Sequence, residues 1–211
     1  MTELTPNNIS LRGLSRLSKG RKIGLYGGSF NPVHAGHIHL VKQGLNRLGL
    51  DEVWVLVTPG NPLKNNRPDM APLAQRLIAT KQAIKGPRVR VFDLETPLDT
   101  RYTADTVTKL ITIMPRTHFV WMMGADNAQI FHHWGQWRKI VTIVPIAIFD
   151  RTGYSKTGRS SRLTREYGRF KVQPEKLAGS QTPCWAFINN ARHPASSTMI
   201  RHQSDRDWWD Q

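Results

Sequence analysis

The sequence predicts an α/β protein with a Rossmann-like, doubly wound and mainly parallel sheet that carries helices on both faces. The first observation is that segments with strand and helix patterns alternate over most of the chain, which is typical of right-handed βαβ units. The second is that the expected strands are largely apolar, as strands buried on both faces of a sheet are. The third is the length of 211 residues, which suits one domain and is short for two.

Local signals mark the expected elements in the first half of the chain. The first helix has apolar residues at helical spacing and stops before Gly49, a residue that favours helix ends. The third helix has Thr103 as a candidate N-cap and Asp105 in its first turn. These signals, with a proline at the start of the second helix and apolar runs for the strands, predict strands at 21–26, 53–57 and 88–94 and helices at 34–48, 72–84 and 103–113.

The second half continues the series. Strands are expected at 117–123, 142–149 and 185–188, and helices at 126–133 and 196–202, with a break at Trp134-Gly135-Gln136-Trp137. As domain organisation we expect a basic and flexible N-terminal extension at 1–20, a single domain at 21–204 with a basic insertion near 151–176, and a C-terminal tail at 205–211.

The charge of the chain is strongly positive and unevenly spread. The formal net charge is +15 and the sequence pI is about 10.6, so the protein should attract polyanions such as nucleotides or nucleic acid. Residues 1–22 carry a net charge of +4 and residues 151–176 one of +6, and both stretches are poor in large apolar residues. Their simplest interpretation is a solvated tail or loop, and charge alone names no substrate.

The single cysteine and the absence of long apolar runs bear on the compartment. Cys184 cannot form an internal disulfide, and its apolar neighbours predict a buried side chain without catalytic role. No apolar run reaches the length of a membrane helix, and residues 1–20 do not resemble a secretory signal. We therefore expect a cytoplasmic protein.

The segment most informative about chemistry follows the first expected strand: Gly27-Gly28-Ser29-Phe30-Asn31-Pro32-Val33-His34-Ala35-Gly36-His37. Glycines let the backbone turn tightly and approach a ligand, and the free N–H groups of such a turn and of the next helix start bind anions. Two histidines three residues apart on one helix face can point at the same phosphate group. A strand–turn–helix with two glycines is common, so the histidines give the segment its specificity.

Two other interpretations compete for this segment. A histidine pair can be half of a metal site, but no carboxylate or cysteine stands at a persuasive spacing. The segment matches neither the dinucleotide-binding fingerprint nor the P-loop. A phosphate-binding turn remains the favoured interpretation.

This segment resembles the signature of the HxGH nucleotidyltransferase superfamily. A second superfamily motif, Ile-Ser-Ser-Thr-x-Ile-Arg, is similar to residues 195–201, where Ala195 replaces the first isoleucine. Ser196, Ser197 and Thr198 as a plain helix cap would be the simplest explanation of that motif alone. Together, the two motifs imply one ATP site in a nucleotidyltransferase fold.

Further blocks are similar to those of bacterial nicotinate-nucleotide adenylyltransferases. They are Tyr-Thr-x-Asp-Thr at 102–106, and Gly-Ala-Asp at 124–126 followed by Trp134. Pro62-Leu63-Lys64 is similar to the family's Pro-His-Lys, with Leu63 in place of the histidine, which puts that side-chain contact in doubt. The resemblance covers about residues 22–201.

The resemblance implies transfer of the adenylyl group of ATP to nicotinate mononucleotide, giving deamido-NAD and pyrophosphate. The acceptor phosphate would attack the α-phosphorus directly, and Mg²⁺ would be held by ATP oxygens and water, with no protein side chain as ligand. The implied catalytic residues are His34, His37, Lys64 and Arg201. The implied ATP-binding residues are Gly27, Gly28, Ser29, Phe30, His34, His37, Gly124, Asp126, Ser196, Ser197, Thr198 and Arg201, and the implied acceptor-binding residues are Ser29, Phe30, Lys64, Tyr102, Thr103, Asp126 and Trp134.

Simpler roles stand beside these assignments. Trp134 could be a core residue, and Asp126 could be an N-cap. Another HxGH enzyme, such as a phosphopantetheine adenylyltransferase, is one alternative function. A basic nucleic-acid-binding protein is another, although the chain shows no RNA-binding signature and we expect no specific nucleic-acid partner and no membrane partner. A homo-oligomer is compatible with the sequence.

Overall fold

A six-stranded parallel sheet forms the centre of the structure. The structure, a computed structural model, describes residues 11–60, 70–151 and 154–189. Within them the strands are β1 (Lys22–Gly28), β2 (Glu52–Val57), β3 (Val89–Phe92), β4 (His118–Gly124), β5 (Ile146–Phe149) and β6 (Trp185–Ile188). Their order in the sheet is β3-β2-β1-β4-β5-β6, so the direction of winding reverses between β1 and β4. In open α/β sheets, ligands bind at the carboxyl ends of the strands beside such a reversal.

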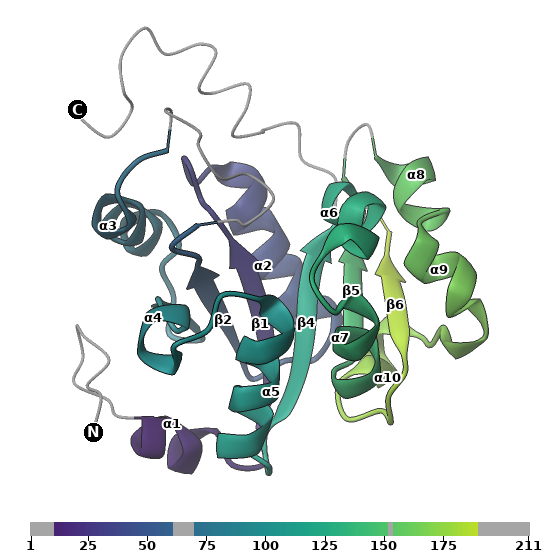
Figure 1. Cartoon of the computed structure of the whole chain (residues 1–211), viewed down its shortest axis with the longest axis horizontal. Coiled ribbons are helices and arrows are strands. Elements are labelled where there is room, and N and C mark those ends of the chain that lie inside the picture. Colours follow the sequence, from purple (N-terminus) through teal and green to yellow (C-terminus); the bar gives the residue numbers. More distant parts are fainter. Residues whose placement is uncertain (1–10, 61–69, 152–153, 190–211) are drawn as a thin grey trace, which may run out of the picture.

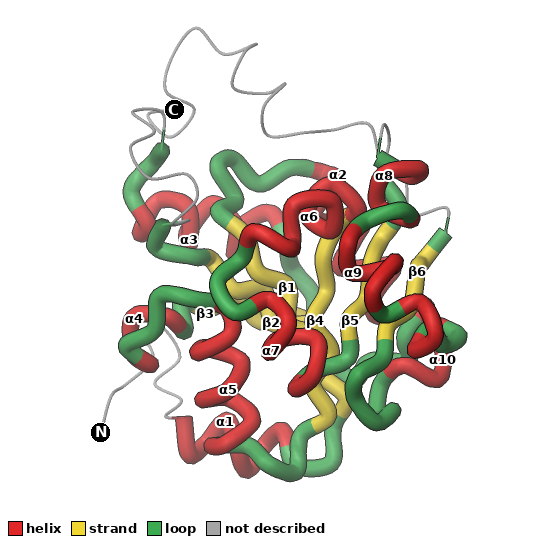
Figure 2. Tube along the Cα trace, turned by 45° about the vertical axis from the view of Figure 1, so that its right-hand side comes forward, coloured by secondary structure: helices red, strands yellow, loops and turns green. Residues whose placement is uncertain are grey.

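The helices lie on both faces of this sheet (Figure 1). The arrowheads of β4, β5 and β6 point to the end of the molecule where α6 and α8 lie, and Figure 2 shows the same arrangement from another side. The helices among the described residues are α1 (Leu11–Ser18), α2 (Ala35–Arg47), α3 (Leu73–Ala83), α4 (Glu95–Leu98), α5 (Thr103–Ile113), α6 (Ala125–Ile130), η2 (Phe131–His133), α7 (Trp137–Ile143), α8 (Ser155–Arg159), α9 (Arg162–Glu166), η3 (Gly168–Phe170) and α10 (Pro174–Leu177).

Alternate residues of each strand supply two hydrophobic cores, one on each face. Leu25 and Trp121 face the core under α4, α5, α6 and α7, whereas Tyr26 and Met122 face the core under α2 and α10. Because successive side chains of a strand point to opposite faces, a sheet covered on both sides needs apolar residues at every position. The predicted α/β fold with a doubly wound parallel sheet is confirmed.

The N-terminal extension is more ordered than the sequence suggests. Residues 11–18 form α1, whose Leu14 is 1% exposed in the core and whose Ser15 hydroxyl donates to the Ile113 carbonyl at 3.0 Å. The expectation of a flexible extension therefore does not hold for this helix, because Leu14 anchors it on the end of α5. Residues 1–10 lie outside the described part of the chain.

Two further expectations of local structure were wrong. The sequence predicts a strand from residue 142 onward, but α7 ends at Ile143 and β5 begins only at Ile146. Residues 151–176 were expected to be solvated loop, yet the chain from residue 155 to 177 contains α8, α9, η3 and α10, with Leu163 and Leu177 buried. Their exposed arginines and lysines lie on the outer face of these short helices, which cover the β6 end of the sheet (Figure 1). The buried free Cys184 is confirmed, and no helix in the described ranges is long and apolar enough to cross a membrane.

Candidate active site

The turn after β1 contains two glycines that make room for aromatic rings. A Cβ on Gly27 would meet Trp121 Cη2 at 2.6 Å, and one on Gly28 would meet the Phe30 ring at 3.2 Å. Real Cβ atoms do not approach other atoms as closely as 2.6 Å. The glycines were interpreted from the sequence as room for a ligand, and the structure adds that Gly27 is needed to seat the Trp121 indole against β1.

Phe30 gives the turn its shape. Its φ of 48° lies in the left-handed region, which costs a residue with a Cβ about 1 kcal/mol or more. Its ring is 1% exposed and lies 4.8 Å from the His37 ring and 5.5 Å from the Tyr26 ring, measured between centroids. The buried ring offsets the backbone strain. The Phe30 ring is therefore part of the core beside the turn.

His34 and His37 form the N-terminal cap of α2. His34 is the N-cap residue, and its Nδ1 accepts the Gly36 N–H at 3.1 Å. His37 Nδ1 in turn accepts the His34 N–H at 3.1 Å, which completes a capping box made of two imidazoles. In a neutral imidazole, a nitrogen that accepts a hydrogen bond carries no proton, so the proton sits on the other nitrogen. Both rings therefore carry their proton on Nε2.

The His37 ring stays neutral at physiological pH. Burial lowers its pKa well below the usual 6.5, and the neighbouring His34 and Arg151 lower it further. A neutral ring cannot act as a cationic clamp for phosphate. It can donate one directed hydrogen bond from Nε2, which suits stabilisation of a transferring phosphoryl group.

At the carboxyl ends of β4 and β5 an ion pair joins two site segments. The Arg151 guanidinium lies 2.6 Å from Asp126 Oδ2, and the Asp126 side chain folds back against the Cα of Gly124. The other carboxylate oxygen, Oδ1, is buried and has no hydrogen-bond partner among the described residues. Asp126 caps no backbone N–H of α6, whose N-cap is Gly124. The interpretation of Asp126 as a simple N-cap is therefore wrong.

Tyr102 and Trp134 come together on the other side of the site. Tyr102 is the N-cap of α5, so the expected N-cap Thr103 is the first helical residue. The first N–H groups of a helix lack acceptors within it. A Cβ on Gly135, next to Trp134, would lie 2.9 Å from the Tyr102 ring. The two predicted acceptor-binding segments are thus neighbours, and Gly135 permits the close approach.

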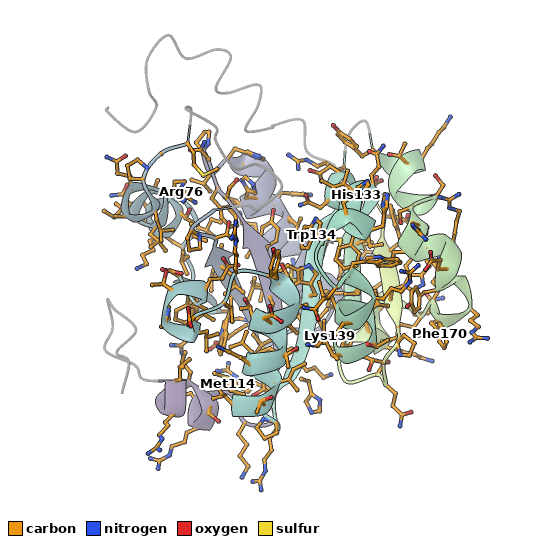
Figure 3. The ribbon with its side chains drawn as sticks, viewed as in Figure 1. Arg76, Met114, His133, Trp134, Lys139 and Phe170 are labelled. Carbon is orange, nitrogen blue, oxygen red and sulfur yellow. The ribbon has the colours of Figure 1, made fainter. Side chains whose placement is uncertain are left out.

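Trp134 is neither a core residue nor a free surface residue. Its ring is partly exposed and makes edge contacts with Phe131 and Trp121, at centroid distances of 5.2 and 6.1 Å. Figure 3 labels it near the middle of the molecule, close to His133. Because Trp121 also lies against Gly27, its indole links the β1 turn to the Trp134 segment. The described halves of the predicted site therefore meet at the point where the strand order reverses.

Several predicted site residues lie outside the described part of the chain. They are Lys64, Ser196, Ser197, Thr198 and Arg201, together with Leu63 and the helix expected at 196–202. The remaining predicted residues belong to three parts of the structure. Gly27, Gly28, Ser29, Phe30, His34 and His37 lie in the segment from β1 to the start of α2, Gly124 and Asp126 lie where β4 meets α6, and Tyr102 and Thr103 at the start of α5 lie beside the segment of Trp134.

Three neighbours of the site were missed from the sequence. Arg151 pairs with Asp126, Tyr26 lies against His37 with a ring centroid distance of 6.1 Å, and Trp121 links the two sides. Arg151 could have been found, because it lies just beyond the carboxyl end of a predicted strand, where ligands bind in such sheets. Tyr26 and Trp121 look in sequence like any other aromatic residue of a buried strand.

Comparisons with known proteins place the chain in a family. A family profile for cytidylyltransferase-like domains matches residues 25–203. A Ruegeria pomeroyi protein with the name probable nicotinate-nucleotide adenylyltransferase is 45% identical over 193 residues, covering 90% of both chains. A Methylorubrum extorquens protein of the same name is 45% identical over 184 residues, covering 85% of this chain and 98% of its own.

Solved structures agree on the fold. The nicotinic acid mononucleotide adenylyltransferase of Plasmodium falciparum, in its complex with APC, gives a TM-score of 0.62 at 18% identity, with 86% of this chain and 83% of that chain covered. The same enzyme complexed with NaAD also gives 0.62, at 19% identity and the same coverage. At such identities the likeness concerns the fold alone, and the sequence relatives decide the assignment. The chain belongs to the nicotinate-nucleotide adenylyltransferase family of cytidylyltransferase-like proteins.

Proposed function

We propose that this protein transfers the adenylyl group of ATP to nicotinate mononucleotide, releasing pyrophosphate and forming deamido-NAD. Relatives at 45% identity that cover 85–90% of the chain and carry the name of this activity support the proposal. The position of the site also supports the proposal, because it lies where the strand order reverses between β1 and β4.

The observation that carries the proposal is the pair of imidazoles at the start of α2. Each is held by its Nδ1 in the capping box, and we propose that the Nε2–H of each ring is the donor to the substrate phosphates. An acceptor phosphate is already an anionic nucleophile and needs no general base. Catalysis then consists of aligning it with the α-phosphorus and stabilising the charge that develops on the transferring and leaving phosphates. Neutral donors fixed in one direction do this without reorganising.

The opposite side of the site suits the acceptor. The N–H groups that begin α5 at Thr103 are oriented to receive a carboxylate such as that of nicotinate. Trp134, partly exposed beside them, offers a ring face for stacking. We propose that Asp126 takes ribose hydroxyls, and that Arg151, whose guanidinium lies 2.6 Å from Asp126 Oδ2, adds positive charge near the phosphates.

The remaining roles follow the sequence motifs. We propose that Lys64 and Arg201 add positive charge to the phosphates, and that Ser196, Ser197 and Thr198 bind phosphate oxygens. Mg²⁺ fits a site of this kind as a partner of ATP, because it retains several waters and binds phosphate oxygens, and the described residues contain no cluster of three acidic, histidine or cysteine side chains. When bound, it neutralises charge on the leaving pyrophosphate.

An acceptor panel tests the proposal. Purified protein with ATP and Mg²⁺ is given nicotinate mononucleotide, nicotinamide mononucleotide or phosphopantetheine, and pyrophosphate release is followed. We expect the highest kcat/KM with nicotinate mononucleotide. A preference for phosphopantetheine, or no release with any acceptor, would reject the proposed function.

A further inference from the structure

We propose that Arg76, on α3, is a positioning residue that fixes the peptide planes of the turn after β1 and so aims the turn's N–H groups at the substrate phosphate. The proposal rests on the proposed function, because it assigns Arg76 a role in that reaction. Arg76 is not among the residues that the sequence motifs single out. It lies on the β2 and β3 side of the sheet and is labelled beside α3 in Figure 3.

The Arg76 side chain is buried and is held by backbone carbonyls. It is 1% exposed, and its hydrogen-bond acceptors are the carbonyls of Ala71 (2.8 Å from Nε), Ser29 and Thr58 (both 2.8 Å from Nη1) and Pro59 (3.0 Å from Nη2). Burial lowers the pKa of this guanidinium, and the nearby Asp93 only partly offsets the effect. A buried cation held by neutral carbonyls is costly, so a side chain of this kind needs every one of these bonds.

Four acceptors from three chain segments meet at one guanidinium. Ser29 belongs to the turn after β1, Thr58 and Pro59 follow β2, and Ala71 precedes α3. Two further hydrogen bonds connect the same segments. The Thr58 N–H donates to the Gly28 carbonyl at 3.0 Å, and the Ala71 N–H donates to Asn31 Oδ1 at 3.1 Å. The turn is thus fastened to the β2 side at Gly28, Ser29 and Asn31.

The fastening determines where the N–H groups of the turn point. In a planar trans peptide the N–H lies on the side opposite to the C=O. The Gly28 carbonyl faces the Thr58 N–H, so the Ser29 N–H points away from β2. The Ser29 carbonyl faces Arg76, so the Phe30 N–H points away from the guanidinium that also holds the Thr58 and Pro59 carbonyls. Two successive N–H groups directed alike form a concave anion site.

Arginine is suited to this task and lysine is not. The planar fork offers five N–H donors in a fixed geometry, whereas an ammonium group is a point charge with three rotating donors. A lysine at this position could keep the positive charge but could not hold the Ser29 and Ala71 carbonyls in the same plane. Arg76→Lys therefore keeps the positive charge and removes the planar arrangement of hydrogen-bond donors, so its effect reports on that arrangement alone.

The test measures kinetics and a backbone resonance in Arg76→Lys. We expect kcat with saturating ATP and nicotinate mononucleotide to fall by roughly tenfold to a hundredfold, up to the smallest loss, about a hundredfold, that follows removal of a transition-state donor itself. In ¹⁵N-labelled wild type, the Phe30 amide resonance should shift on addition of α,β-methylene-ATP, and in Arg76→Lys this shift should shrink by half or more. The control is Leu110→Ala, a buried change on the other face of the sheet, chosen because it lowers the thermal midpoint without touching the turn.

Each outcome decides the proposal. A folded Arg76→Lys with kcat within about twofold of wild type, or with an unchanged Phe30 shift, would overturn it. A loss of kcat no greater than in Leu110→Ala would also overturn it, because stability would then explain the effect. Should Arg76→Lys fail to fold, the wild type decides: the Arg76 Nε–H resonance must move when the ATP analogue binds, and no movement contradicts the proposal. If wild type transfers adenylyl groups to none of the acceptors but the resonances behave as expected, the proposed function fails while the role of Arg76 in shaping an anion site stands.

Discussion

The rings of His34 and His37 lie with their centroids 3.8 Å apart and their planes tilted by 34°, while the Nδ1 atom of His37 accepts the His34 backbone N–H. The same two residues therefore cap α2 and present its ligand donors. Because both Nδ1 atoms accept capping bonds, protonation of a ring at Nδ1 breaks one of these bonds, and the lowered pKa of His37 keeps the protonation of its own ring below neutral pH. The hydrogen bonds that fix the start of α2 therefore also decide which nitrogen of each ring carries the proton.

Replacement of His37 separates the capping role from the donor role. In His37→Asn the amide oxygen can accept the His34 N–H in place of Nδ1, but no donor remains at the position of Nε2. We expect the thermal midpoint to change little and kcat to fall about 10²-fold or more, as for other single transition-state donors. Steady-state kinetics check this, with the exposed His118 at the far end of β4 as the control in His118→Asn. Full activity in His37→Asn would remove the ring from the mechanism.

Trp134 should matter for the acceptor and not for ATP. Trp134→Ala removes the ring face proposed to stack on nicotinate, so we expect KM for the mononucleotide to rise by about tenfold, the value of a stacked aromatic contact, with KM for ATP unchanged. Trp134→Phe keeps a ring and should fall between wild type and alanine. The opposite pattern, with KM for ATP rising alone, would place Trp134 on the nucleotide side.

The contact between Gly135 and Tyr102 can be tested by a double-mutant cycle. Gly135→Ala places a methyl group 2.9 Å from the Tyr102 ring, and the displaced ring should shift the start of α5. We expect a higher KM for the mononucleotide in Gly135→Ala, and no added effect of Gly135→Ala in a Tyr102→Ala background, because the clash is then absent. Additive effects of the two changes would show that the residues act independently.

Glu95 should make stability depend on pH near neutrality. Burial first, and Asp93 second, raise the pKa of this carboxyl from 4.5 to about 7. Between those values the folded chain binds more protons at Glu95 than the unfolded chain, so the free energy of unfolding falls as pH rises through this window. Glu95→Gln has no carboxyl group at this position, so its free energy of unfolding does not fall with pH for this reason. Urea titrations should show that the variant gains on wild type between pH 5 and pH 8, and an equal gap at both pH values would contradict the assignment.

The sequence predicts the fold where local and tertiary preferences agree. The bounds of α5 and β6 coincide with the predicted ranges, and the histidine segment lies at the end of β1 as expected. The prediction fails at the end of α7, where the β-branched Thr142 and Ile143 favour a strand locally. There the buried Trp137, Ile140 and Val141 lie on one helix face against the core, and this packing overrides local propensity.

The site is predictable only as far as its chemistry is carried by motif residues. His34, His37, Asp126 and Trp134 could be named from spacing and resemblance. Arg76 could not, because an arginine within a helix is normally exposed, and its acceptors are backbone carbonyls from three segments that only the tertiary structure brings together. Residues that orient a backbone carry no chemical signature in the sequence.

The most direct test of the central claim is a crystal structure with α,β-methylene-ATP and nicotinate mononucleotide bound together. The account predicts the α-phosphate oxygens within hydrogen-bonding reach of Nε2 of His34 and His37, with the nicotinate ring on Trp134. A nucleotide bound with its phosphates away from the start of α2 would contradict it.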